Sequence, residues 1–314
     1  MLSPDIKHFR AKTTSFVLRL AEVTSSSGTS AHFRNMQDGF MTNFFPLALF
    51  LSGWAGMAAA QVGPSIDELA RELSNPGAAN ATLNFKFEYR SFDGSLPGAS
   101  EQDSFTTTFQ PVLPFVLDNG NNLIFRPAFP YVVGQPSFNL GSNTFDTASQ
   151  FGDLPYDLLY SWSNNGWTFG AGLVGSVPVG SSISSDNWLL GPSFLAVRPT
   201  DWGIWGLFPF HNEKVDGSGP DVSVTSLQYF LFASLSDGWQ VGMGPTISYD
   251  WNAVSGQEWT VPIGLTVAKT TAIGRQLVKL NAGFEYNVVR PDAFASDWKF
   301  TFTFSPVVKN PFQK

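Results

Sequence analysis

Long runs in which apolar and polar residues alternate constrain the fold of this chain more than any other feature. Residues 278–288 read VKLNAGFEYNV, and similar runs begin at Leu83, Trp239, Trp259 and Trp298. Successive side chains of a β-strand point to opposite faces, so each run predicts a strand with one apolar face and one small or polar face. Runs of ~10 residues fit a tilted membrane-crossing strand, whereas soluble strands typically have ~5–6 residues.

The connections between these runs alternate in length. Short connections with turn residues lie at 118–122, 163–167, 199–202, 236–239 and 270–275. The connections between them lie at 92–102, 133–150, 178–186, 212–221, 252–256 and 289–296, and all of these are longer except 252–256, whose five residues weaken the pattern. Short turns at one end and longer loops at the other are typical of a membrane barrel. The sequence therefore predicts an all-β fold, a transmembrane antiparallel up-and-down β-barrel of about 12 strands. The expected strands are 81–91, 103–116, 122–132, 151–161, 167–177, 187–198, 202–211, 222–233, 239–251, 257–269, 276–288 and 297–305.

The tryptophans support this prediction independently, because indole rings prefer the membrane–water interface. Four of them flank the short connections and four flank the long ones: Trp162, Trp167, Trp202 and Trp239, then Trp188, Trp251, Trp259 and Trp298. Trp205 is expected mid-strand, where a core tryptophan would lie.

Prolines inside the runs conflict with a closed barrel, because each removes a hydrogen-bond donor and no edge strand shelters it. Bulges or kinks are expected at Pro111, Pro114, Pro127, Pro130, Pro155, Pro192, Pro209, Pro245 and Pro262.

Composition excludes several function classes. Only 14% of residues are charged, against ~25% in soluble domains. The chain has no cysteine, which excludes thiolate metal sites and a cysteine nucleophile. After residue 60 it has 13 basic residues (18 less 5) and 22 acidic ones (25 less 3), a balance of −9, which argues against nucleic acid as a partner.

The first 60 residues are interpreted as a leader. Residues 44–60 read FFPLALFLSGWAGMAAA, an uncharged apolar run whose A-x-A end predicts signal-peptide cleavage near Ala60/Gln61. A membrane anchor is the alternative, but the run is shorter than the ~20 residues a helix needs. Residues 1–35 are long and polar for a signal peptide, so Met36 or Met41 is an alternative start.

The mature chain is expected to begin with a periplasmic helix and linker over 61–79, followed by the barrel over 80–314. Ser65, with Glu68 three residues on, predicts the cap of a helix over 65–74.

Several segments are similar to a bacterial family of outer-membrane transporters whose label refers to the MetA pathway of phenol degradation, and some of whose members carry the name neuromedin U. They are GPTISYDW (244–251), TVPIGL (260–265), SLQYFL (226–231), FTFSPVVKNPF (302–312), AQVGPSIDELARELSNP (60–76) and NATLNFKFEYRSFDG (80–94). The long leader and the final Gln313 and Lys314 depart from the family pattern. The resemblance implies an outer-membrane location and passive uptake of small aromatic or hydrophobic compounds.

Alternation also predicts the charged residues that face the barrel interior. They are Lys86, Glu88, Arg90, Arg126, Asp250, Lys279, Glu285 and Lys299, with Asp153, Asp157, Glu258 and Lys269 as further candidates. They would either line a polar conduit or fill the interior as a network of ion pairs. The expected partners are outer-membrane lipid, small-molecule solutes and the barrel assembly machinery.

Two other functions remain open. A lipid hydrolase would have to use His211, the one histidine after residue 60, and no serine motif accompanies it. A structural or adhesive barrel would display the loops at 133–150 and 212–221. Without histidine clusters or cysteine, no metal and no cofactor is expected, and no catalytic residue is predicted.

Overall fold

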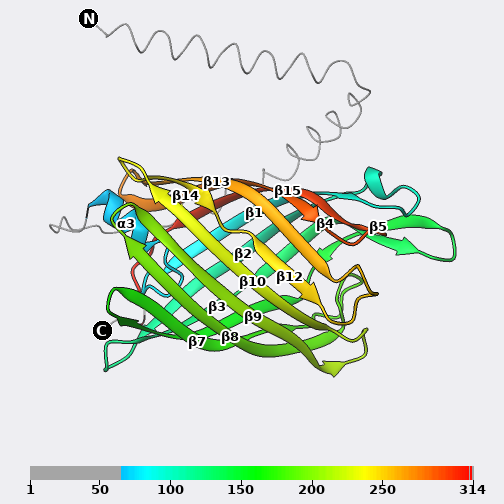
Figure 1. The fold of residues 1–314 in the computed structure, drawn as a ribbon, viewed down its shortest axis with the longest axis horizontal. Coiled ribbons are helices and arrows are strands. Elements are labelled where there is room, and N and C mark those ends of the chain that lie inside the picture. Colours follow the sequence, from blue (N-terminus) through cyan, green and yellow to red (C-terminus); the bar gives the residue numbers. More distant parts are fainter. Residues whose placement is uncertain (1–64, 311, 313–314) are drawn as a thin grey trace, which may run out of the picture. The chain divides into compact units, whose positions relative to one another are not determined.

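A computed structural model describes residues 65–310 and 312, which fold as a closed antiparallel β-barrel (Figure 1). β1 pairs with both β15 and β2, and this double pairing closes the sheet. Its elements are α3 (Ile66–Glu72), β1 (Thr82–Asp93), η2 (Ala99–Glu101), β2 (Asp103–Val116), β3 (Asn122–Pro127), β4 (Phe129–Asn139), β5 (Thr144–Phe151), β6 (Leu154–Asn164), β7 (Trp167–Val177), β8 (Asn187–Thr200), β9 (Gly203–Gly217), β10 (Ser223–Ser234), β11 (Trp239–Met243), β12 (Thr246–Asp250), β13 (Trp259–Ile273), β14 (Gln276–Val289) and β15 (Ala295–Pro306).

The predicted twelve-strand barrel is confirmed, with two of its strands each divided in two. β3 and β4 together form one barrel strand, as do β11 and β12, and β5 lies outside the ring. None of the helices among the described residues is long and apolar enough to cross a membrane. The predicted leader and its cleavage site lie outside the described residues.

Several prolines coincide with breaks in the hydrogen-bonded ladder. Pro245 separates β11 from β12, and Pro127 is the last residue of β3. The β13–β14 register shifts at Pro262, and the β8–β9 pairing skips Pro192. The expectation of bulges is wrong for four other prolines, whose pairings show no register shift: Pro111, Pro114, Pro155 and Pro209. Proline has no backbone N–H to donate, so a break at its position leaves fewer unmatched carbonyl groups in the ladder.

The expectation of a loop over 133–150 is wrong, because most of that segment is a β-hairpin. β4 continues to Asn139 and pairs with β5, and Figure 1 shows this hairpin projecting from the end opposite α3. Phe145 of β5 lies with its ring centroid 4.5 Å from that of Phe294, just before β15. This aromatic contact holds the hairpin against the loop before β15.

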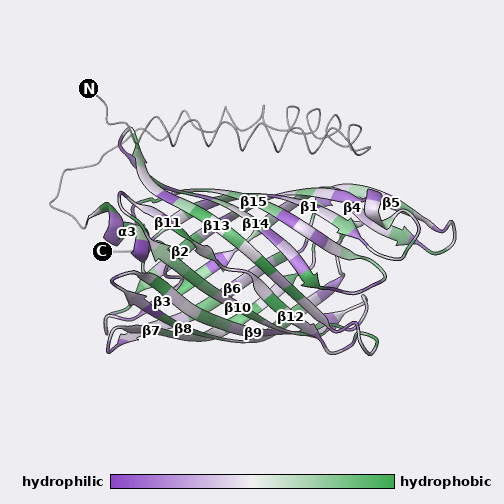
Figure 2. Ribbon diagram, turned by 45° about the horizontal axis from the view of Figure 1, so that its top comes forward, coloured by the Kyte–Doolittle hydropathy of each residue, from purple (hydrophilic) through white to green (hydrophobic). Residues whose placement is uncertain are grey.

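The outward face is apolar over most of the strands, and Figure 2 shows hydrophobic and hydrophilic residues alternating along them. Phe284 and Phe302 are exposed on this face, as the alternation predicts. Trp205 does not lie mid-strand as expected, since β9 begins only two residues before it. It is exposed, and its ring packs edge-to-face on Trp167 at 5.1 Å, so it belongs with the tryptophans near the short turns.

The inward face is not polar all round, contrary to the pattern of the clearest strands. An apolar cluster of buried residues fills the interior along β6 to β10: Leu159, Val174, Leu195, Val197, Ile204, Phe208 and Phe230. Inward glycines make room for it, because a Cβ on Gly206 would lie 2.6 Å from the Phe230 ring. The opposite wall, formed by β1, β14 and β15, carries the charged residues. The interior therefore has an apolar half and a charged half.

Candidate functional site: a polar cavity inside the barrel

The residues before β1 position one wall of the site. Ser65 caps α3, accepting from the Glu68 N–H at 3.2 Å, while Glu68 Oε2 accepts from the Ser65 N–H at 2.8 Å. That backbone hydrogen bond lowers the pKa of Glu68, with a further contribution from the Ser65 hydroxyl. Asp67 Oδ1 accepts from the Gly238 N–H at 2.5 Å, which fixes α3 to the turn between β10 and β11. The helix thus lies at the short-turn end of the barrel.

Residues 73–81, here called the crossing segment, run from α3 to β1 across the barrel interior. On one side Ser74 Oγ donates to Gln240 Oε1 of β11 at 2.8 Å. On the other side Asn75 Nδ2 donates to Thr168 Oγ1 of β7 at 2.9 Å, and Ser161 Oγ of β6 donates to the Gly77 carbonyl at 2.8 Å. These strands lie on opposite parts of the closed sheet, so the segment bridges the interior.

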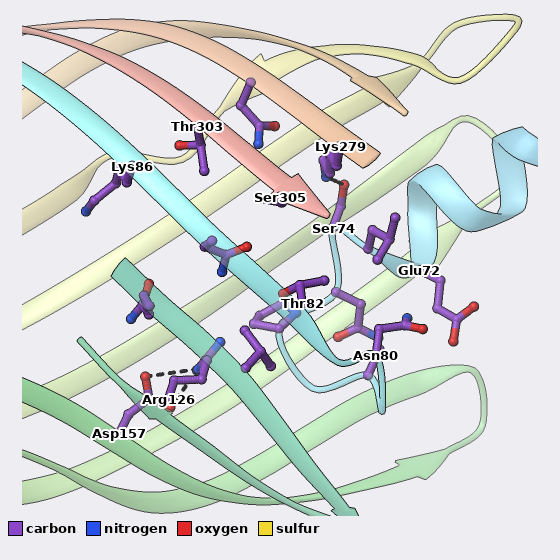
Figure 3. Close-up of a pocket in the computed structure, with 18 of the residues that line it drawn as sticks. Glu72, Ser74, Asn80, Thr82, Lys86, Arg126, Asp157, Lys279, Thr303 and Ser305 are labelled. Carbon is purple, nitrogen blue, oxygen red and sulfur yellow. Dashed lines mark hydrogen bonds and ion pairs between the residues drawn. The ribbon is translucent and has the colours of Figure 1, made fainter. Parts of the chain in front are cut away.

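A cavity of about 390 Å³ lies between the crossing segment and the inner barrel wall (Figure 3). Its volume falls within the ~300–1,000 Å³ usual for small-molecule sites. Most of its lining is polar, with amides and hydroxyls from the crossing segment and from β1, β2, β10, β14 and β15. Leu73 and Phe208 contribute apolar surface.

One ion pair lies in the wall of this cavity. Arg126 Nε of β3 donates to both carboxylate oxygens of Asp157 on β6, at 2.7 and 3.0 Å. The two residues are direct register partners, and their side chains are largely buried. The Arg126 guanidinium also lies 5.8 Å from the centre of the Phe208 ring. This pair joins the charged half of the interior to the apolar half.

A second, larger cluster surrounds Glu88. Its carboxylate lies 3.0 Å from Lys86 Nζ, 3.5 Å from Arg90 Nη2 and 3.5 Å from Lys299 Nζ. Lys299 Nζ is also 3.1 Å from Glu285 Oε2. Closure of the barrel creates this cluster, because β1 supplies three of its members, β15 supplies Lys299 and β14 supplies Glu285.

Lys279 of β14 points toward the crossing segment. Its ammonium donates to Ser74 Oγ, and the residue is buried. None of the described carboxylates lies within ion-pair distance of Lys279, unlike Lys86, Arg126 and Lys299. Figure 3 shows Lys279 and Ser74 side by side at the edge of the cavity.

The structure thus places seven of the eight predicted interior residues in the cavity wall or the Glu88 cluster. The eighth, Asp250, lies in neither, and its Oδ1 accepts from the Asn252 N–H at 2.9 Å near the end of β12. Lys269, a further candidate, is not inward. Its Nζ lies 2.8 Å from Asp237 Oδ2 and 5.0 Å from the centre of the Trp239 ring at the barrel rim.

Two other candidates, Asp153 and Glu258, lie in connections between strands. Asp153 accepts from Ser184 Oγ and from the N–H and Oγ of Ser185. Burial raises the pKa of Asp153, but these hydrogen bonds outweigh burial and the pKa is lowered overall. Glu258 Oε2 accepts from the Gly256 N–H at 2.8 Å. Both carboxylates therefore organise loops.

Sequence reasoning missed the polar contribution of the crossing segment. Ser74, Asn75 and Asn80 line the cavity, although nothing in their spacing distinguishes them from an ordinary linker. It also missed Phe208, whose neighbours in the sequence, Leu207 and Pro209, are both apolar. An apolar run without alternation does not reveal which residues point inward.

His211 contacts two polar side chains on the outer surface. Its Nδ1 lies 3.0 Å from Thr225 Oγ1, and its Nε2 lies 3.0 Å from Glu213 Oε2. Trp251 Nε1 also donates to Thr225 Oγ1, at 2.9 Å. In the part of the chain that the structure describes, no three His, Asp or Glu residues are grouped so that they could hold a metal ion.

Comparisons with known proteins identify the fold only. No family model and no curated protein matches this chain. Among solved structures, an outer membrane channel from Pseudomonas putida F1 is similar, with a TM-score of 0.54 and 13% identity over 73% of this chain and 96% of that chain. The chain shares the barrel fold of that channel. The NanC porin is also similar, with a TM-score of 0.45 and 12% identity over 72% of this chain and 99% of that one. The resemblance to the phenol-degradation family stays a prediction.

Proposed function

We propose that this protein is an outer-membrane channel through which small molecules enter passively. The observation that carries the proposal is a closed barrel with an apolar outer face and a polar cavity of about 390 Å³ inside. Exposed aromatic and aliphatic side chains around a barrel suit lipid, whereas charged residues inside suit water and solutes. The similar structure from Pseudomonas putida F1 is itself described as an outer membrane channel, which supports the same role here.

The orientation follows from the two ends of the barrel. Barrels of the outer membrane keep short turns on the periplasmic side and long loops outside. The short-turn end, with α3 and the crossing segment, is therefore periplasmic, and the β4–β5 hairpin is extracellular. An export signal cleaved near Gln61 and delivery to the barrel assembly machinery belong to this proposal.

Small aromatic or hydrophobic compounds are the proposed solutes. The resemblance to transporters labelled for phenol degradation supports this class. The buried cluster along β6 to β10 also supports it, because Phe208 extends that apolar surface into the cavity wall.

Conductance of the purified protein in planar lipid bilayers tests the channel. Wild type should conduct in a salt gradient, and Lys86→Gln should shift the reversal potential toward cations, because one interior positive charge is removed. Exchanging both Lys86 and Lys299 for Glu would be a poor test, since both contact Glu88 and four carboxylates, including Glu285, would then lie together. A folded, heat-modifiable wild type that never conducts would refute the channel in favour of a structural barrel.

A lipid hydrolase remains a second candidate because of the hydroxyl–imidazole–carboxylate contacts of Thr225, His211 and Glu213. In such an arrangement the imidazole accepts the hydroxyl proton and the carboxylate orients the imidazole. Phospholipid hydrolysis by the purified protein that disappears in His211→Ala would favour this candidate. A channel predicts no hydrolysis above the level of His211→Ala.

A further inference from the structure

The interior charges do not balance. The cavity and the adjoining Glu88 cluster together contain five cations, Lys86, Arg90, Arg126, Lys279 and Lys299, and four carboxylates, Glu72, Glu88, Asp157 and Glu285. Glu72 is exposed at the edge of the cavity. The other three carboxylates form ion pairs with every one of these cations except Lys279. Among the described residues, the Ser74 hydroxyl is the one hydrogen-bond partner of the Lys279 ammonium.

A buried ammonium with a neutral partner is unfavourable, because water no longer solvates its charge. Lys279 is 8% exposed, and it lines the cavity. Its ammonium has three N–H donors, of which the described residues accept one, through Ser74 Oγ. An anion in the cavity would supply both the missing charge and the missing acceptor.

Polar groups of the cavity wall offer further donors. Asn84, Asn281 and Thr303 line the cavity, and their amides and hydroxyl can donate to a carboxylate.

The remaining surface of the cavity is apolar. Phe208, Leu73 and Val112 line it together with the polar groups. A ligand that satisfies both kinds of surface has a compact apolar body and one anionic group.

We infer that the cavity binds a small organic anion, a carboxylate on an apolar body, with Lys279 as its counter-charge. This inference rests on the proposed function, since it names the chemical class of solute that the same interior would select.

The rival interpretation gives Lys279 a structural role only, as an anchor for the crossing segment through Ser74. Lys279→Gln separates the two roles, because glutamine keeps a side-chain N–H for Ser74 Oγ but removes the charge. Lys269→Gln is the matched control, since Lys269 lies at the outer rim against Trp239 and Asp237, away from the cavity.

Isothermal titration calorimetry on the purified full-length barrel in detergent tests the inference with three probes. Benzoate has the charge and the apolar ring, benzamide has the ring without the charge, and acetate has the charge without the ring. Benzoate should bind at one saturable site, with both other probes about tenfold weaker or more. Lys279→Gln should weaken benzoate binding about tenfold and leave benzamide unchanged.

Leu73→Ala removes apolar surface from the cavity wall, so it should weaken benzoate binding about fivefold and leave acetate binding unchanged. It keeps the inference testable if Lys279→Gln does not fold, because Leu73 lies outside the strands. Equal binding of benzoate and benzamide, no saturable benzoate binding to wild type, or benzoate binding that neither cavity variant weakens would overturn the inference. Parallel bilayer recordings separate the two proposals. Conductance without benzoate binding would refute the anion site and support the channel. Benzoate binding to a barrel that does not conduct would refute the channel and support the anion site.

Discussion

Removing the charge of Glu88 should destabilise the barrel more than any other conservative change in the interior cluster. Glu88→Gln keeps the size of the side chain and replaces a carboxylate that contacts Lys86, Arg90 and Lys299. After the exchange, three cations on neighbouring positions of β1 and β15 would repel one another with one carboxylate, Glu285, left between them.

The magnitude follows from the burial of the partners. The Glu88 side chain is 6% exposed, so solvent hardly screens its ion pairs, and removing one partner of a buried pair costs ~3–5 kcal/mol. The side chains of Lys86 and Arg90 are 37% and 41% exposed. Because both can regain hydration, the low end of that range, ~3 kcal/mol, is expected.

Glu285→Gln is the matched control. Among the described residues, Glu285 forms an ion pair with Lys299 alone and is 26% exposed, so its loss should cost about 1 kcal/mol or less. Urea unfolding in lipid vesicles, followed by tryptophan fluorescence and by heat-modifiable migration on gels, gives both free energies. If the two variants lost the same stability, the assignment of Glu88 as the centre of the cluster would be wrong.

Three other predictions concern the outer face, processing and pH. Phe284→Arg should cost ~2–4 kcal/mol of barrel stability because the residue faces lipid, and Thr303→Arg, directed into the cavity, should cost much less; equal costs in urea unfolding would contradict the register. Mass spectrometry of the protein from the outer membrane should find a mature N-terminus near Gln61, and an intact 1–40 segment would contradict it. The pKa of Asp153 is lowered in the folded state, so its contribution to stability should be present above the ordinary Asp pKa and lost as pH falls through the lowered value. Asp153→Asn should therefore flatten the acid side of the thermal-stability profile, and an unchanged profile would refute this role.

Alternation predicted the number of barrel strands and, on strands with one apolar and one polar face, the direction of the side chains. Phe284 and Phe302 face outward, while Lys279 and Glu285 face inward, as period two requires. Such predictions succeed because the direction of a side chain on a strand depends only on its position along that strand.

Where both faces of a strand are apolar, the same reasoning fails. Residues 204–210 read IWGLFPF, and hydropathy does not show that Ile204 and Phe208 point inward while Trp205 points outward. Nor does local composition reveal that a strand continues into a segment predicted to be a loop, as β4 does into its hairpin with β5. In the first case the direction of the side chains, and in the second the length of the strand, depends on the strand with which it pairs.

By itself, the sequence determined an alternating, charge-poor chain that can satisfy its backbone hydrogen bonds in lipid only by closing into a barrel. The tertiary structure decided which interior charges meet. Glu88 contacts Lys299 because the first strand pairs with the last. Ser74 contacts Lys279 and Gln240 because the crossing segment lies inside the closed barrel. Contacts between residues so distant along the chain depend on ring closure, and no local pattern encodes them.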